Sequence, residues 1–248
     1  MPQADAPLIR SVGLSGLLVT FAERLSEEAN RAAIAFRAAI DAEGWAEVEE
    51  TSSTLTSTFL SYDPLGIDES DLRTRLRALL AERDWMAAPY PAGCRLWTIP
   101  CVFGTDLAPQ LGDAAKIAGM SEADAIRQLT AARPRVLTLG FAPGQPYLGQ
   151  LDPAWDIPRQ SAITSSVPEG ALVLAIRQFV LFATSAPTGW RHVGQTAFKG
   201  YRPSSDTPFA LSPGDAVQFR AIRPEELEEI RSYDTTGDGG ATTEPLEI

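Results

Sequence analysis

The chain has 248 residues, 44% of them hydrophobic, with a mean hydropathy of -0.07, values typical of a globular protein. No apolar run approaches the ~20 residues that cross a bilayer, and residues 1–10 lack the pattern of a secretory leader, so we expect a cytoplasmic protein that is not in a membrane. The net charge of -11 excludes nucleic acid as a partner, because phosphates require a basic surface.

Residues 1–88 predict a small α+β domain. A strand is expected at 14–21, an extended segment at 48–62, and a helix after each of them. Ser26 can cap the first helix and Gly44 can end it. The apolar faces of the two helices consist of Ala29, Ala33, Phe36 and Ile40, and of Leu72, Leu76, Leu79 and Leu80. This order of elements predicts a small α/β sandwich.

The Pro- and Gly-bearing segment 86–93 predicts a linker, and residues 94–230 predict a second domain. A strand at 96–103 and two short helices at 109–118 and 121–131 come first. Strands at 136–141, 171–176, 179–183 and 216–222 then alternate with Gly- and Pro-rich segments, which is typical of a barrel or sandwich. Residues 231–248 are acidic and rich in Gly and Thr, and predict a disordered tail.

Few residues suit a metal or a disulfide. Cys94 and Cys101 are the only cysteines, and in a chain without a leader two free buried thiols are favoured over a disulfide. His192 is the only histidine, so no metal site is expected. A structural role for His192 is favoured over a catalytic one, since the sequence shows no nucleophilic residue that could act together with it.

The segment 139–153 reads LGFAPGQPYLGQLDP and carries the most information about function. Its glycines permit unusual backbone angles, and its prolines reduce the entropic cost of a fixed shape. A stiff loop with exposed backbone amides can bind a carboxylate or a phosphate. The alternative is a loop that only turns a barrel corner. Arg159, nearby in the sequence, could bind such an anion bidentately or form an ordinary surface ion pair.

This segment resembles the Gly-Phe-x-Pro-Gly-Phe-Pro-Tyr-Leu-Gly-Gly-Leu-Asp signature of the allophanate hydrolase subunit 1 family, whose members are also known as the B subunit of 5-oxoprolinase. That family includes a sporulation-kinase inhibitor. The resemblance covers about residues 8–222 and continues through the segments 62–64, 99–104, 157–159, 167–170, 189–190 and 193–196.

The resemblance implies an α+β protein with a small α/β sandwich followed by a cyclophilin-like β-barrel. It also implies an ATP-dependent amidohydrolase that acts with a homologous second barrel subunit on a small anionic or cyclic amide substrate. No Gly-x-x-x-x-Gly-Lys-Ser/Thr loop is present, so an ATP site would be of another kind and shared with the partner. The expected ligand-binding residues are Gly140, Phe141, Pro143, Gly144, Tyr147, Arg159 and Gln178.

The chain departs from the family at several polar positions. Gln110, Leu129, Gln145 and Gln195 stand where the family usually has Asp, His, Phe and Arg, and Ile176-Arg177 replaces a Gly-Gly pair. These losses favour an alternative, a non-catalytic regulatory protein that binds a histidine kinase. A third hypothesis is a prolyl isomerase of the cyclophilin type, which only the expected barrel fold suggests. Trp190 is expected in the core or at a partner contact rather than against a ligand.

Overall fold

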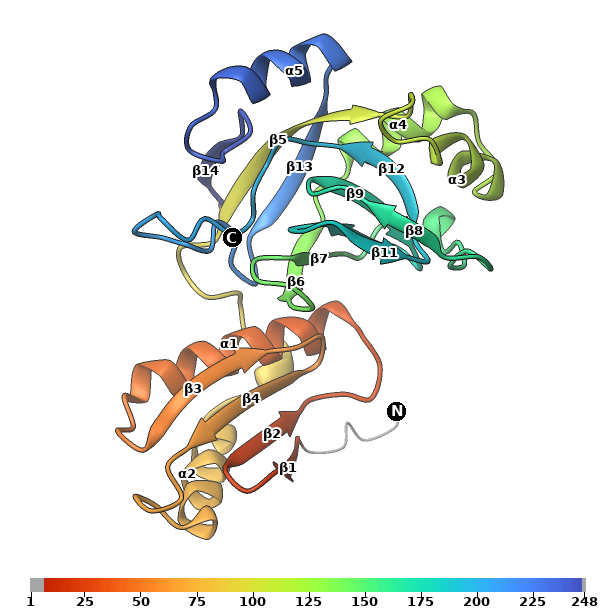
Figure 1. The fold of residues 1–248 in the computed structure, drawn as a ribbon. Helices are drawn as coiled ribbons and strands as arrows, with labels where there is room; N and C mark the ends of the chain where they lie inside the picture. Colours follow the sequence, from red (N-terminus) through yellow and green to blue (C-terminus); the bar gives the residue numbers. More distant parts are fainter. Residues whose placement is uncertain (1–6, 247–248) are drawn as a thin grey trace. The chain divides into compact units, whose positions relative to one another are not determined.

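The computed structural model describes residues 7–246. The chain divides into two compact units, residues 1–92 and 93–247 (Figure 1). The division falls inside the segment 86–93, which the sequence predicts to be a linker. The expected fold class, α+β with a small sandwich and a barrel, is confirmed. No helix among the described residues is long and apolar enough to cross a bilayer.

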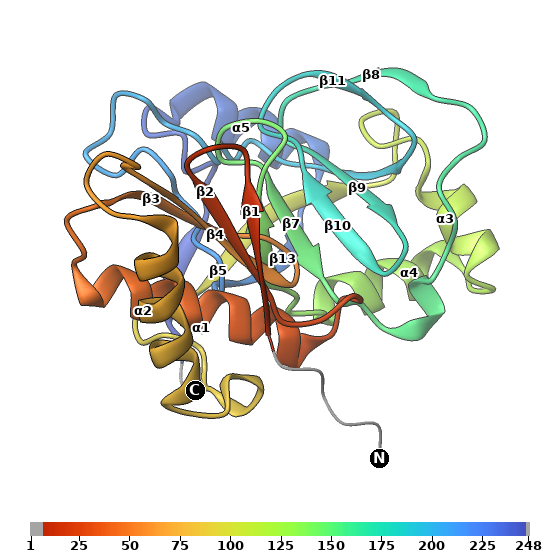
Figure 2. The same ribbon diagram turned by 90° about the horizontal axis from the view of Figure 1, so that it is seen from below.

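The first unit is an antiparallel sheet packed against two helices. The strands β1 (Leu8–Val12), β2 (Gly16–Thr20), β3 (Val48–Ser53) and β4 (Ser57–Tyr62) lie in the order β1-β2-β4-β3 (Figure 2). The predicted single strand at 14–21 is therefore one arm of a hairpin, and the extended segment 48–62 is a second hairpin. The helices α1 (Glu27–Glu43) and α2 (Glu69–Ala81) share one hydrophobic core with the sheet.

Helix α1 begins and ends where its sequence predicts. The Ala29 backbone N–H donates to Ser26 Oγ at 3.1 Å, which satisfies one of the amides left free at a helix start. Gly44 adopts the left-handed conformation at φ 62°, which favours glycine after a helix end. Phe36 and Ile40 on the predicted apolar face are buried.

The second unit contains, within the described residues, a closed seven-stranded barrel. Its strands are β5 (Arg95–Phe103), β6 (Arg135–Leu139), β7 (Pro146–Gly149), β9 (Ala171–Ala175), β10 (Gln178–Leu181), β12 (Arg191–Gln195) and β13 (Ala216–Ala221). They follow the order β12-β9-β10-β7-β6-β13-β5, and pairing of β5 with β12 closes the ring. The helices α3 (Leu111–Ile117) and α4 (Glu122–Ala131) connect β5 to β6. The short strands β8 (Thr164–Val167) and β11 (Ala186–Thr188) pair separately.

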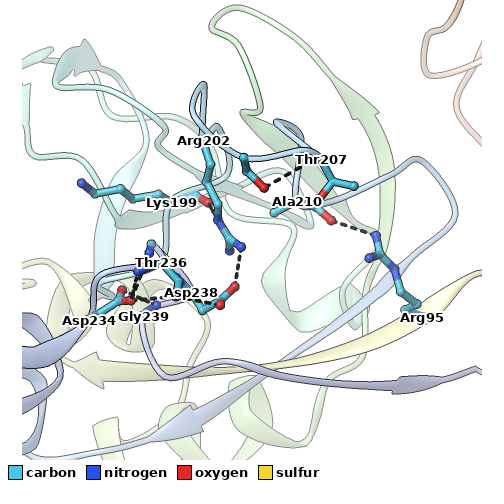
Figure 3. A network of polar contacts seen from close by, with 11 residues as sticks. Arg95, Lys199, Arg202, Thr207, Ala210, Asp234, Thr236, Asp238 and Gly239 are labelled. Carbon is cyan, nitrogen blue, oxygen red and sulfur yellow. Dashed lines mark hydrogen bonds and ion pairs between the residues drawn. The ribbon is translucent and has the colours of Figure 1, made fainter.

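The acidic tail is ordered over its described residues, so the prediction of disorder from 231 onward is wrong there. Helix α5 (Pro224–Tyr233) leads into a turn and then into β14 (Thr242–Pro245), which pairs with the first half of β5. The Asp234 carboxylate accepts hydrogen bonds from the backbone amides of Thr236 at 2.9 Å and Gly239 at 2.8 Å. Asp238 forms a salt bridge with Arg202 (Figure 3). Its acidic composition predicts a solvated tail, but here the carboxylate of Asp234 accepts hydrogen bonds from the backbone amides of a tight turn and so stabilises it.

Both cysteines are buried, and within residues 7–246 neither forms a disulfide, as the sequence predicts. Cys101 lies in β5, inside the barrel core, where burial raises the pKa of its thiol. It is therefore a small hydrophobic residue in this position and not a reactive thiolate.

Candidate functional site

A cavity of about 240 Å³ opens beside the β6–β7 hairpin of the barrel unit. Three of the predicted ligand-binding residues, Phe141, Tyr147 and Arg159, come together in its wall. The other lining residues are Gln145, Val180, Phe182, Pro187, Thr188, Gly189 and Trp190. Segments far apart in the sequence therefore meet here: the hairpin loop, the stretch before β8, strand β10 and the residues before β12.

The hairpin loop keeps its shape through its own backbone. The Gly140 amide donates to the Gln145 carbonyl at 3.0 Å, and the Gln145 amide donates to the Ala142 carbonyl at 3.1 Å. Phe141 is held at φ 71°, a left-handed conformation that a bulky residue rarely adopts, and its side chain is 75% exposed. In the described part of the chain the amides of Phe141 and Ala142 donate no hydrogen bond. Of these two residues, Phe141 lines the cavity.

Four predicted residues do not line the cavity, and two of them have a clear structural role instead. Gly144 is at φ 71°, and a Cβ there would lie 2.5 Å from the Gly200 carbonyl, so it permits a close backbone approach. Gln178 is buried in β10 and packs over Gly149. Gly140 and Pro143 belong to the loop and are absent from the cavity wall.

Trp190 forms a rigid aromatic wall of the cavity. Its ring meets that of Tyr147 edge to face, with centroids 6.4 Å apart, and its side chain is only 7% exposed. It belongs to a small hydrophobic cluster with Val180 and Phe182, which also line the cavity. Of the two positions predicted for Trp190, the core or a partner contact, the structure shows a hydrophobic cluster, and the residue lines the cavity as well, which the sequence did not predict.

Arg159 lies over Trp190, with its guanidinium carbon 5.5 Å from the ring centroid. Its neighbours in the chain fix its backbone: the Pro158 carbonyl accepts from Arg191 at 2.6 Å, and the Gln160 amide donates to the Gly189 carbonyl at 2.7 Å. Within residues 7–246 the Arg159 guanidinium has no carboxylate partner. The charge is therefore held in place but not neutralised.

This arrangement can bind a small anion next to an apolar or planar group. Arg159 can pair with a carboxylate or phosphate, the loop amides can add hydrogen bonds, and Trp190 offers a flat surface. The lining contains no carboxylate, histidine or cysteine that could act as a base or a nucleophile at neutral pH.

Gln145 and Thr188 are lining residues that the sequence did not single out for binding. The Ala183 amide donates to Gln145 Oε1 at 3.4 Å, and the Trp190 amide donates to Thr188 Oγ1 at 3.0 Å. Gln145 was visible only as a departure from the family signature. Its burial to 1% exposure follows from the hairpin geometry, which the sequence alone does not provide.

The fold and the site together define a two-domain protein with a small-ligand cavity on a β-barrel. The chain belongs to the carboxyltransferase domain family, subdomain C and D, whose profile matches residues 7–211. The resemblance inferred from the sequence is thereby confirmed.

Two similar proteins are named as the B subunit of 5-oxoprolinase. The one from Bacillus subtilis (strain 168) is 30% identical over 233 residues, which is 90% of this chain and 96% of the relative. The one from Escherichia coli O157:H7 is 34% identical over 125 residues, 50% of this chain and 57% of the relative. The chain thus spans almost all of the first relative and little more than half of the second.

Solved structures share the fold. PH0987 from Pyrococcus horikoshii, described as a conserved uncharacterized protein, matches with a TM-score of 0.51 and 29% identity, over 88% of this chain and 99% of its own. TTHA0988 matches with a TM-score of 0.71 and 27% identity, over 87% of this chain but 40% of its own. The Kluyveromyces lactis urea carboxylase matches with a TM-score of 0.78 over 99% of this chain and 25% of its own. At 20% identity the last likeness concerns the fold alone.

Proposed function

We propose that this protein is a subunit of an ATP-dependent amidohydrolase of the 5-oxoprolinase type and that its cavity binds the anionic end of a small cyclic amide. The observation that carries the proposal is Arg159, held over Trp190 at the cavity without a carboxylate partner among the described residues. The names of the B. subtilis and E. coli relatives support the substrate class.

The chemistry of 5-oxoproline suits this cavity. The molecule is a five-membered lactam ring that carries one carboxylate. Its carboxylate would pair with the Arg159 guanidinium and the Phe141 amide, and its ring would pack on Trp190. A guanidinium with no internal carboxylate partner loses no ion pair when such a ligand binds, so the gain is offset by desolvation and ordering but not by a broken salt bridge.

The cavity does not fit ATP. It has a volume of about 240 Å³, and Arg159 is the one cationic side chain in its lining, whereas a triphosphate carries several negative charges. We therefore assign no step of nucleotide chemistry to this chain. A nucleotide site would lie with, or be shared with, a second subunit.

The cavity lining contains no carboxylate, histidine or cysteine, so the proposal takes the general base from elsewhere. A homologous second barrel subunit is the partner we propose. The match to TTHA0988 supports a larger assembly, because the region similar to this chain makes up only 40% of that chain.

The test is co-expression with the homologous second subunit, followed by measurement of ATP hydrolysis that depends on 5-oxoproline. We expect turnover in the complex and a KM for 5-oxoproline at least tenfold higher in Arg159→Gln, with a smaller change in kcat. Arg127→Gln is the matched control, because Arg127 is an exposed arginine on α4 outside the cavity. A well-formed complex without turnover, or an unchanged KM in Arg159→Gln, would overturn the proposal.

A second candidate function is a regulatory protein that binds a histidine kinase without catalysis. The polar positions that differ from the family favour it: Leu129, for example, is fully buried in the barrel core where the family has a histidine. Phe141 adds an exposed aromatic ring that a protein partner could cover. Capture of a histidine kinase by the intact chain, together with no turnover in the complex, would establish this function in place of the first.

A further inference from the structure

The start of helix α3 is connected to the walls of the cavity by two sets of side-chain hydrogen bonds. Asp113, in the first turn of α3, pairs with Arg191 of β12, with 2.6 Å between Oδ2 and Nε. Gln110, directly before α3, donates from Nε2 to Gln160 Oε1 at 2.8 Å. The described residues that line the cavity include none of these four, so any effect they have on a ligand must pass through other residues.

Arg191 makes the first connection. Its side chain is 8% exposed, and it uses two edges of the guanidinium: Nε donates to Asp113, and Nη1 donates to the Pro158 carbonyl at 2.6 Å. That carbonyl belongs to the peptide unit that ends at the nitrogen of Arg159, so the bond fixes the plane from which the Arg159 side chain leaves the backbone. A planar guanidinium can hold two acceptors in fixed directions, whereas the ammonium of lysine is a single point charge.

Gln160 makes the second connection and holds the other wall. Its Nε2 donates to the Trp190 carbonyl at 2.9 Å, and its backbone amide donates to the Gly189 carbonyl at 2.7 Å. Its Oε1 accepts from Gln110 Nε2, and Gln110 Oε1 accepts from the His192 amide at 2.7 Å. Both side-chain amides are therefore used at their two ends, which assigns one orientation to each. A carboxylate at position 110, the usual residue of the family, would have no donor for Gln160.

We propose that the start of α3 positions the anion-binding group of the cavity, with Gln110 and Asp113 as positioning residues that do not touch a ligand. Through their two connections the Arg159 guanidinium is held 5.5 Å from the ring centroid of Trp190. A binding group that is misplaced by about 1 Å can cost roughly 100-fold in rate, so the connections matter to an anion that pairs with Arg159. The inference rests on the proposed function, but the position of Arg159 can be measured without any ligand.

The first test follows the side-chain NMR signals of Arg159 in the intact protein without ligand. The ring current of an aromatic side chain shifts protons that lie over it upfield, and the loss of these signals in Arg159→Gln assigns them. Arg191→Lys keeps the charge beside Asp113 but not the two directed donors, and we expect the Arg159 signals to move downfield, toward the values of exposed arginines. Unmoved signals in a folded Arg191→Lys protein would overturn the proposal.

A matched control separates positioning from stability. Asp238→Asn disturbs a similar pair in the same unit, since Asp238 is 42% exposed and its partner Arg202 is 14% exposed, against 56% for Asp113 and 8% for Arg191. We expect it to lower stability without moving the Arg159 signals. If Arg191→Lys does not fold, Asp113→Asn takes its place, because Asp113 is exposed. Equal movement of the Arg159 signals in Asp238→Asn would overturn the proposal.

The second test measures KM and kcat in the complex with the homologous second subunit. Asp113→Asn and Gln110→Asp should each raise the KM for 5-oxoproline by about three- to tenfold with a smaller change in kcat, because they disturb an anion-binding group and not the reacting atoms. Asp238→Asn should leave KM unchanged, and an unchanged KM in both α3 variants would overturn the proposal. If the unaltered complex shows no turnover, the proposed function fails, and the Arg159 signals still decide whether α3 positions the guanidinium.

Discussion

At the scale of single residues, the turn between β9 and β10 places two unfavourable residues in the left-handed region. Ile176 has φ 44° and Arg177 has φ 60°, at positions where the family usually has two glycines. The surrounding backbone holds the turn: the Ile176 amide donates to the Ile157 carbonyl at 2.8 Å, and the Arg177 amide to the Trp155 carbonyl at 2.9 Å. A β-branched residue is the least tolerated of these, because its Cβ substituents crowd the backbone.

We therefore predict that Ile176→Gly stabilises the barrel unit by about 0.5–1 kcal/mol. Relief of roughly 1–2 kcal/mol of left-handed strain is offset in part by the greater flexibility of glycine in the unfolded chain. Little packing is lost, since Ile176 is 40% exposed. Urea denaturation should show a higher midpoint at an unchanged slope. Ile176→Val, which remains β-branched, serves as the control, and a lower midpoint for the glycine variant would contradict the prediction.

The candidate site shows how far residue-level reasoning reaches. The loop signature and Arg159 pointed to residues of which three, Phe141, Tyr147 and Arg159, lie together in one cavity wall, because glycine, proline and arginine have distinctive chemistry that can be recognised in a sequence. The contact of Arg159 with Trp190 could not be predicted, since it depends on the hydrogen bond between the Gln160 amide and the Gly189 carbonyl. Gly144 was predicted to bind a ligand because of its conformational freedom. In the structure, glycine at this position permits the backbone to approach that of Gly200 closely.

At the scale of elements, closure of the barrel depends on a close approach of β12 to β5. Gly194 of β12 pairs with Phe103 of β5, next to a register shift between His192 and Gly194. A Cβ on Gly194 would lie 2.5 Å from the sulfur of Cys101 and 3.3 Å from a methyl group of Leu172. The two strands can pair here only because one side chain is missing.

We predict that Gly194→Ala destabilises the barrel unit by about 1–3 kcal/mol, the usual cost of overpacking a core. Cys101→Ala removes the sulfur that clashes, so the double variant Gly194→Ala, Cys101→Ala should recover a large part of the loss. Denaturant unfolding of both single variants and the double variant completes a double-mutant cycle. Additive effects of the two substitutions would show that the clash with Cys101 is not the cause.

Helices and strands with a buried apolar face could be predicted from the sequence. Exposed strands that form only by pairing with the edge of another strand could not. Helix α1 has both a capping residue and a complete apolar face, so its bounds were evident. Strand β1 is almost entirely exposed, and its sequence has no apolar alternation. Strand β14 has four exposed residues and exists because it pairs with the free half of β5. Such pairing depends on which strand edge is open, and this is a property of the assembled fold.

At the scale of the whole molecule, the free energy of unfolding is expected to depend on pH in two separate ranges, one set by carboxylates and one by the single histidine. Hydrogen bonds from Arg73 and from Ser121 lower the pKa values of Glu69 and Asp124, so their contributions to stability are lost only as the pH falls below about 4. His192 is the only group with an ordinary pKa near 6.5. Any change in stability between pH 8 and 5.5 therefore reports mainly on one imidazole.

We predict that the barrel unit loses stability as the pH falls through about 6.5. Since burial lowers the pKa of His192 in the folded state, the unfolded chain binds the proton more readily, and the free energy of unfolding decreases by up to about 1.4 kcal/mol per pH unit once the pH is below the unfolded value. Above that value both states are neutral, and no dependence is expected.

The measurement is urea unfolding at several pH values between 8 and 5.5, followed through the amide signals of β9, which pairs with β12. His192→Gln removes the titrating group and should flatten the dependence. Equal slopes in the two proteins would mean that His192 is protonated as easily in the folded state as in the unfolded chain, and the prediction would then be wrong.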